Sequence, residues 1–139
     1  MIKKKSGYTV AILGATGAVG RETLEILEER KFPMIGLRLF ASARSAGEVM
    51  TCLGKEYTVE ELTDSSSFDG VDLAFISATD AISREYGHRL GAAGIAVIDD
   101  SAVFRMDDGV PLVVPEVNAA ALHAMSRGIV SIPNCTTTP

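Results

Sequence analysis

The stretch TVAILGATGAVG, residues 9–20, decides the fold of this chain. Residues 9–13 are a continuous apolar run, which is typical of a strand buried on both faces of a sheet. Gly14, Gly17 and Gly20 follow, and glycine permits a tight turn and close approach of the backbone to a neighbour. From Ala18 to about Arg30 the apolar residues recur at helical spacing, with Val19, Thr23, Ile26, Leu27 and Arg30 expected on one side. The stretch therefore predicts a strand, a glycine-rich turn and a helix.

Apolar runs and helical periodicity alternate along the rest of the chain. Further strands are expected at residues 37–41, 57–59, 73–77, 95–99 and 129–132. Further helices are expected at residues 81–93 and 118–125, with an extended segment at residues 112–114. This alternation predicts one α/β domain over residues 1–139, a Rossmann-like, doubly wound, mostly parallel sheet.

Composition excludes several classes of function. The 139 residues are 47% hydrophobic and 22% charged, as in an ordinary globular domain. The net charge of -5 argues against nucleic acid or an anionic membrane as a partner. The basic start, Lys3 to Lys5, precedes an apolar run that Gly14 ends too early for export or for spanning a bilayer. Two cysteines and no Cys/His cluster predict a cytoplasmic protein without a metal site.

The glycine-rich turn is the first candidate binding site, because ligands of such sheets bind beyond the carboxyl ends of the strands. Its spacing is G-x-x-G-x-x-G, so Thr16 stands where the dinucleotide-binding pattern usually has a glycine. The same turn occurs for purely structural reasons. With a strand before it and a helix after it, dinucleotide binding is favoured, and the cofactor contacts are expected from Gly14, Thr16, Gly17, Ala18, Val19 and Gly20.

The loop after the second strand bears on the choice of cofactor. An NAD site usually has an acidic residue about 20 positions after the glycine-rich turn. Here that place holds Ser42, Arg44 and Ser45, and the nearest acid is Glu48. These hydroxyls and this guanidinium complement a 2′-phosphate, which favours NADP, although the loop is also compatible with a solvated surface.

Two further residues follow predicted strand ends. Cys135 comes after a strand and before hydroxyl residues suited to starting a helix, and a helix N-terminus favours the reactive thiolate. Cys52 is interpreted as a small buried hydrophobe. Arg105 is compatible with binding a carboxylate or phosphate and equally with an exposed salt bridge. His88 and His123 fall inside predicted helices and are interpreted as surface or packing residues.

These features, taken together and in order, resemble the aspartate-β-semialdehyde dehydrogenase family. The matching stretches are residues 14–20, 42–47, 104–105, 110–118 and 133–137. The related N-acetyl-glutamyl-phosphate reductases share the layout but have glycine before the cysteine. Asn134 therefore favours the aspartate branch.

The resemblance implies NADPH-dependent, reversible reduction of β-aspartyl phosphate to aspartate semialdehyde and phosphate, an early step toward lysine, threonine and methionine. The residue matching Cys135 forms a thioester that hydride reduces, and those matching Arg105 and Asn134 bind the substrate phosphate. Ser42, Arg44 and Ser45 match contacts to the 2′-phosphate, and Ser77 and Ala78 match a further cofactor segment. Family members are homodimers or larger assemblies.

Two positions and the length depart from the family. Thr79 stands where glycine is frequent, and Asp100 stands where asparagine is common. The family's second domain supplies a histidine acid/base, further substrate contacts and most of the dimer interface. We therefore expect this chain to be an N-terminal portion that is inactive alone. Two alternatives are a non-catalytic NADP-binding module acting through a partner, and an acyl-phosphate reductase with another substrate.

Overall fold

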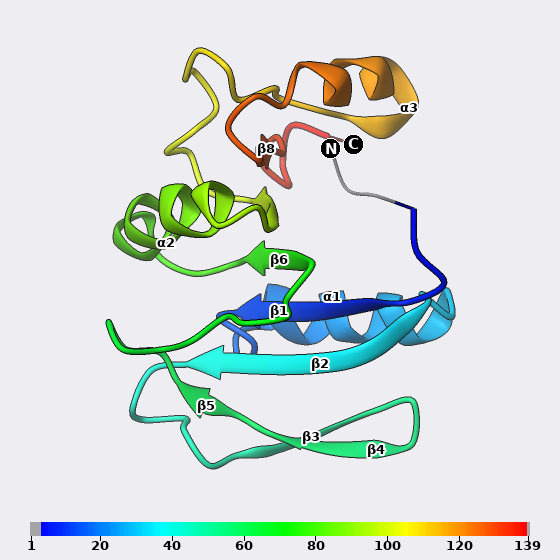
Figure 1. Cartoon of the computed structure of the whole chain (residues 1–139), viewed down its shortest axis with the longest axis vertical. Coiled ribbons are helices and arrows are strands. Elements are labelled where there is room, and N and C mark those ends of the chain that lie inside the picture. The colour runs from blue at the N-terminus through cyan, green and yellow to red at the C-terminus, as the bar shows by residue number, and fades with distance from the viewer. Residues whose placement is uncertain (1–3, 139) are drawn as a thin grey trace.

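The computed structural model describes residues 4–138, so Lys3 of the basic start and Pro139 of the predicted domain lie outside the described residues. A six-stranded parallel sheet forms its centre (Figure 1). The strands lie in the order β5 (Glu60–Glu61), β2 (Met34–Ala41), β1 (Tyr8–Leu13), β6 (Leu73–Ile76), β7 (Ala96–Asp99) and β8 (Ile129–Ser131). The predicted α/β fold class is confirmed.

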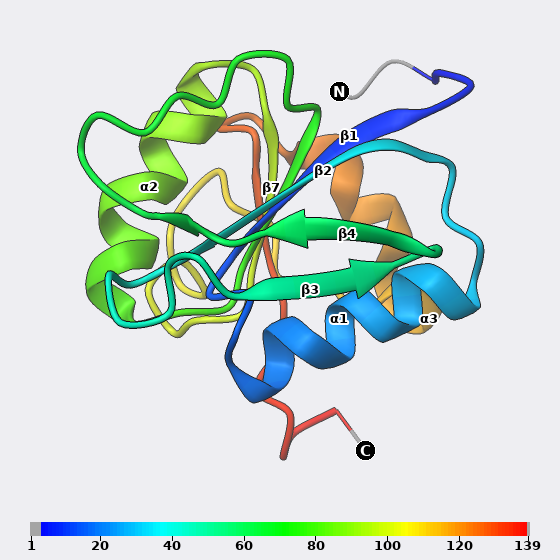
Figure 2. The ribbon, with the colours of Figure 1, turned by 90° about the horizontal axis from the view of Figure 1, so that it is seen from below.

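Helices α1 (Ala18–Glu29) and α2 (Asp80–Ala92) cover opposite faces of this sheet, as Figure 2 shows. Alternate residues of β1 divide between the two cores: Val10 and Ile12 pack with the α1 side, whereas Ala11 and Leu13 pack with the α2 side. Both faces of the central strands are therefore buried, which explains their continuous apolar runs. No helix within residues 4–138 has the length and hydrophobicity that a membrane span requires.

The predicted face of α1 is only partly correct, because Leu27 of that face is buried but Val19 and Ile26 are exposed. Gly20, Leu24 and Leu27 are buried, whereas Val19 and Ile26 are 54% and 40% exposed. A Cβ atom on Gly20 would lie 2.3 Å from the Gly14 carbonyl oxygen, so the backbone of α1 reaches the preceding turn at this point. This close approach fixes the rotation of the helix about its axis and turns Val19 outward.

A hairpin that the sequence analysis missed lies between β2 and β5. Strands β3 (Val49–Cys52) and β4 (Lys55–Thr58) pair antiparallel, so the strand predicted at residues 57–59 begins earlier and belongs to a separate two-stranded sheet. Leu53 and Gly54 form its turn with φ of 50° and 72°. A leucine rarely adopts positive φ, so this turn carries no recognisable sequence signal.

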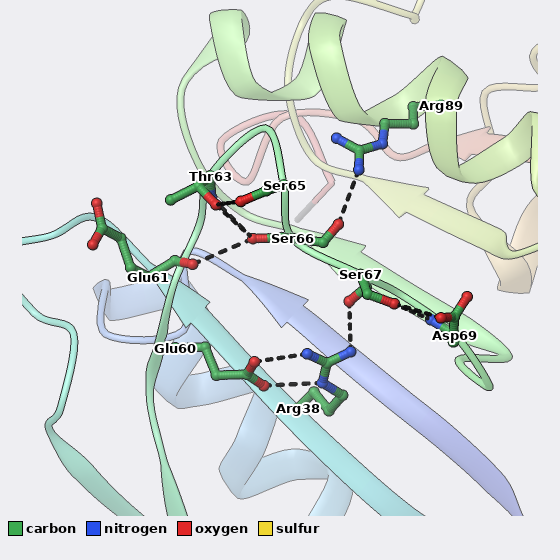
Figure 3. A network of polar contacts seen from close by, with 9 residues as sticks. All are labelled: Arg38, Glu60, Glu61, Thr63, Ser65, Ser66, Ser67, Asp69 and Arg89. Carbon is green, nitrogen blue, oxygen red and sulfur yellow. Dashed lines mark hydrogen bonds and ion pairs between the residues drawn. The ribbon is translucent and has the colours of Figure 1, made fainter.

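A network of polar contacts fixes the chain between β5 and β6 (Figure 3). The Arg38 guanidinium donates to both carboxylate oxygens of Glu60, at 2.9 and 2.6 Å, and to the Ser67 carbonyl oxygen at 2.6 Å. From α2, Arg89 donates to the carbonyl oxygens of Ser66 and Asp64. These contacts attach the loop to β2 and to α2, on the two sides that it bridges.

The helix predicted at residues 118–125 is only partly correct. The structure has a short α3 (Pro115–Asn118) followed by a 3₁₀ helix, η1 (Ala119–Ala124). Proline is favoured at the first helical position, which explains the earlier start. The Asn118 side chain accepts from the Val114 N–H and donates to the Leu112 carbonyl oxygen, which holds the chain back toward the extended segment and interrupts regular helix.

Candidate nucleotide and thiol site

A cleft of about 560 Å³ opens at the carboxyl ends of β1, β2 and β6. Strand β2 pairs with β1 on one side, and β6 pairs with β1 on the other side. The cleft therefore lies at the point where the strand order reverses. It is lined by Gly14, Thr16, Gly17, Ala41, Ser42, Ala43, Arg44, Leu62, Ser77, Ala78, Thr79 and Ile82. Of the predicted cofactor residues, Ala18, Val19, Gly20 and Ser45 do not line it.

The glycine-rich turn brings the backbone close to β6 and leaves donors free for an anion. Gly14 has φ of 86°, and a Cβ atom there would lie 2.1 Å from the Ser77 carbonyl oxygen, so a side chain is excluded. Gly17 precedes α1 without a side-chain cap, and the first turn of α1 has no acidic residue. The first N–H groups of a helix lack intrahelical partners, so Ala18 and Val19 present backbone donors although their side chains lie outside the cleft.

The loop after β2 forms a hydrogen-bonded turn, in which Ser45 and Ala46 N–H both donate to the Ser42 carbonyl oxygen. The Arg44 side chain is exposed, and no acceptor among residues 4–138 binds its guanidinium. The nearest acid, Glu48, pairs with Arg21 at 3.2 Å. Arg21 also donates to the Thr16 carbonyl oxygen at 3.0 Å. Arg21 therefore joins the glycine-rich turn to this loop and partly neutralises Glu48, a role that the sequence analysis missed.

Arg105 joins the ends of β7 and β8. Its Nε donates to the Ile132 carbonyl oxygen at 3.0 Å, and its Nη2 donates to the Asp100 carbonyl oxygen at 2.8 Å. No carboxylate among the described residues lies within salt-bridge distance of its guanidinium, so the alternative of an exposed salt bridge is not realised there. The half-buried guanidinium keeps further N–H groups free.

Asn134 organises the turn that carries Cys135. Its Oδ1 accepts from Thr136 N–H at 2.9 Å and from Thr136 Oγ1 at 2.7 Å, and the Cys135 thiol lies 3.7 Å away. Thr137 N–H then closes a turn on the Asn134 carbonyl oxygen. Residues 135–137 form only this turn, and the helix expected to begin after Cys135 stays a prediction. The thiol is exposed, and Asn134 keeps its Nδ2 donors free of any partner described here.

Asp100 lies between the two groups of candidate residues. Burial raises the pKa of its carboxyl, and the Asp99 carboxylate raises it further. A hydrogen bond from Ser77, which lines the cleft, and the charge of Arg105 oppose this rise. The side chain therefore interacts with the cofactor-side and the thiol-side residues together.

The predicted packing roles of other residues agree with the structure. Cys52 is fully buried in the core beneath α1. The ring of His88 is exposed and meets Phe104 edge to face, with 5.1 Å between ring centroids. His123 lies exposed in η1.

A parallel, doubly wound sheet with a glycine-rich turn at its switch point defines a dinucleotide-binding domain. Residues 9–125 match the family described as "Semialdehyde dehydrogenase, NAD binding domain", and the chain belongs to that family. The resemblance stated from the sequence is thereby confirmed.

Proteins similar to this chain over most of its length are named aspartate-semialdehyde dehydrogenase. The aspartate-semialdehyde dehydrogenases of Aquifex aeolicus and Bacillus subtilis are 51% and 47% identical over 94% of this chain. The chain spans 39% and 37% of their lengths. The crystal structure of aspartate semialdehyde dehydrogenase II complexed with ASA from Vibrio cholerae superposes with a TM-score of 0.91 at 41% identity, covering 95% of this chain and 44% of that one.

Proposed function

We propose that this chain is the nucleotide-binding part of an NADP-dependent aspartate-semialdehyde dehydrogenase. The proposal rests on the arrangement of candidate residues at one edge of the sheet. The cleft lies beyond β1, β2 and β6, and the loops of Arg105 and Cys135 lie next to it, beyond β7 and β8. The same activity is supported by two relatives with this enzyme's name, which are 51% and 47% identical to the chain.

The residues of the cleft fit NADP. The N-terminus of α1 offers backbone donors and partial positive charge to the pyrophosphate. Ser42, Arg44 and Ser45 offer hydroxyls and a charged donor to the 2′-phosphate, and Glu48 is paired with Arg21 rather than free to repel it. Leu62 and Ile82 add apolar surface to the cleft. When bound, NADPH supplies the hydride of the reaction.

We assign the covalent step to Cys135. Its thiolate attacks the acyl carbon of β-aspartyl phosphate, the bond from that carbon to the phosphate oxygen breaks, and phosphate leaves with the electron pair. The free N–H groups of Arg105 and the Nδ2 of Asn134 bind the phosphate oxygens. The acyl group is then a thioester on Cys135. Addition of hydride to its carbonyl carbon and of a proton to the sulfur releases aspartate semialdehyde.

The wider role follows from the family. We infer that the protein acts in the cytoplasm on the route to lysine, threonine and methionine, and that it functions as a homodimer or larger assembly. The cleft and the thiol loop both lie at one open edge of the sheet, which supports a site completed by further protein surface.

Intact-mass measurement of the complete enzyme that contains this chain, mixed with β-aspartyl phosphate, tests the covalent step. We expect an aspartyl adduct that Cys135→Ser removes and that Cys52→Ala, a matched change at the buried thiol, retains. N-acetyl-glutamyl phosphate should give no adduct, and an adduct with this compound alone would identify the alternative reductase. NADPH binding by a folded protein that forms no adduct with either compound would favour the non-catalytic module.

A further inference from the structure

Three buried oxygen atoms lack hydrogen-bond partners among residues 4–138: Ser83 Oγ, Asp99 Oδ2 and Ser131 Oγ. Each belongs to a side chain with no exposed surface. Buried polar groups are nearly always paired with protein or with ordered water, and an unpaired carboxylate oxygen is especially costly. Only the Oδ1 atom of Asp99 is hydrogen-bonded: it accepts from both the backbone N–H and the hydroxyl of Ser101.

Asp99 and Ser131 lie side by side on the face of the sheet that α2 covers. They are direct partners in the parallel register of β7 and β8. Val97 and Ile129, two residues earlier on each strand, belong to the core cluster that contains Tyr86 and Leu90 of α2. Side chains two residues apart on a strand share a face, so Asp99 and Ser131 also point toward α2.

Ser83 lies on the buried side of α2, with Tyr86, Gly87 and Leu90. A Cβ atom on Gly91 would lie 3.3 Å from Ile129 Cγ1, and one on Gly87 would lie 2.6 Å from the Phe104 ring and 3.8 Å from Ile129 Cδ1, so this side of α2 packs on Phe104 and β8. From Gly87, one helical turn toward the N-terminus of α2 covers about 6 Å along the helix axis and ends at Ser83. From Ile129, two residues along β8 cover about 6.6 Å and end at Ser131. Ser83 and Ser131 are therefore at the same end of the packing between α2 and the sheet.

We propose that Ser83, Asp99 and Ser131 form an internal binding site for one water molecule. The chemistry of the three groups matches this ligand, because each serine hydroxyl donates to the water and the water donates to Asp99 Oδ2. A water bound by three polar partners is a usual feature of protein interiors.

The site lies beneath the loops that carry the candidate functional residues. Asp99 precedes Asp100, and Ser131 precedes Ile132, and both of these following residues accept from Arg105 through their carbonyl oxygens. Ser83 lies one turn into α2, whose start carries Ile82 of the cleft. The water thus joins the helix beside the cleft to the two strands that lead to Arg105 and Cys135. This inference stands without the proposed function.

A crystal structure of the protein at a resolution that shows ordered water tests the proposal directly. We expect a peak within hydrogen-bonding distance of Ser83 Oγ, Asp99 Oδ2 and Ser131 Oγ. A direct bond from either serine to Asp99, or from Ser83 Oγ to the Thr79 carbonyl oxygen, with no peak between the three groups, would overturn it.

Relaxation dispersion of water nuclei gives a second test in solution. Ser131→Val replaces the hydroxyl and adds a methyl group in the space of the water, so the variant should lose one long-lived water relative to the unchanged protein. Ser126→Val, the same change at an exposed residue, should retain it. An unchanged signal in a folded Ser131→Val protein would contradict the site. A urea midpoint that depends on sodium rather than choline at equal ionic strength would identify a cation there instead of water.

Discussion

Arg44 is an exposed side chain at the edge of the cleft, with no acceptor among the described residues. Because a charge-assisted hydrogen bond contributes about 1.5–3 kcal/mol, Arg44→Ala should weaken NADPH binding roughly tenfold or more. NADH lacks the 2′-phosphate and should bind almost as before. Calorimetric titration of both cofactors measures this difference, with Arg30→Ala, an exposed arginine at the far end of α1, as the control. Equal losses for the two cofactors would remove Arg44 from the 2′-phosphate site.

Asp100 should make the stability of the protein depend on pH. Its pKa is raised in the folded protein, first by burial and then by Asp99. A carboxyl of this kind favours folding at pH values below its unfolded pKa, and the benefit is lost as the pH rises through its folded pKa. Asp100→Asn should therefore stabilise the protein at pH 7, and its advantage should shrink as the pH is lowered toward 3.

Urea unfolding across this pH range measures the effect. Asp108→Asn, a change at an exposed carboxylate, is the matched control and should have little influence at any pH. A midpoint for Asp100→Asn that falls below that of the unchanged protein at pH 7 would mean that the bond from Ser77 outweighs the cost of burial.

At the scale of elements, the turn between β1 and α1 contains one glycine that packs tightly and one that lines the cleft. A Cβ atom on Gly20 would lie 2.3 Å from the Gly14 carbonyl oxygen, whereas one on Gly17 has its nearest neighbour at 3.3 Å. Gly20→Ala should lower the free energy of unfolding by about 1–3 kcal/mol or more, as overpacking does. Gly17→Ala should cost less stability than Gly20→Ala, because the contact is looser, and should weaken dinucleotide binding, because Gly17 lines the cleft.

Thermal unfolding and cofactor titration of the same two variants distinguish these roles. Similar losses of stability in both variants would show that both glycines are required for packing of the turn. Undiminished NADPH binding by a folded Gly17→Ala protein would place the cofactor elsewhere.

Elements with a strong hydrophobic period were predictable, and those set by tertiary contacts were not. The predicted ranges for β1, β6, α2 and β7 differ from the structure by about one residue at each end, because full burial leaves continuous or regularly spaced apolar residues. The β3–β4 hairpin was missed because its strands are half exposed and Leu53 forms its turn. The face of α1 was predicted only in part, at Leu27, because Gly20, which has no hydrophobic side chain, determines the rotation of the helix.

At the scale of the whole molecule, the two cysteines differ through their surroundings. Cys52 is fully buried, and burial and the nearby Glu28 carboxylate raise the pKa of its thiol. Cys135 is exposed on the turn that Asn134 holds. Since thiolate and access control alkylation, iodoacetamide should modify Cys135 in the folded protein at least tenfold faster than Cys52. Peptide mass mapping checks this, and both residues should react in urea. Comparable rates in the folded state would mean that the core beneath α1 opens readily.

The candidate site was predictable where it follows strand ends and unpredictable where distant residues complete it. Gly14 and Ser42 each follow a predicted strand and Ser77 ends one, so the rule for parallel sheets brought them to one edge. Leu62 and Ile82 enter the same cleft from a loop and a helix with no motif of their own. Arg21 was missed because only the folded chain brings Glu48 and the Thr16 carbonyl oxygen to it.

The sequence by itself determined the parallel α/β architecture, the family and the order of the candidate residues along one edge of the sheet. These depend on local periodicity and on residue types at fixed spacing, both of which are present in the unfolded chain. Only the tertiary structure decided the rotation of α1, the pairing of Glu48 with Arg21, the anchoring of Arg105 and the burial of polar atoms of Ser83, Asp99 and Ser131 without partners among the described residues. Such features depend on contacts between residues far apart in the chain, for which local sequence carries no signal.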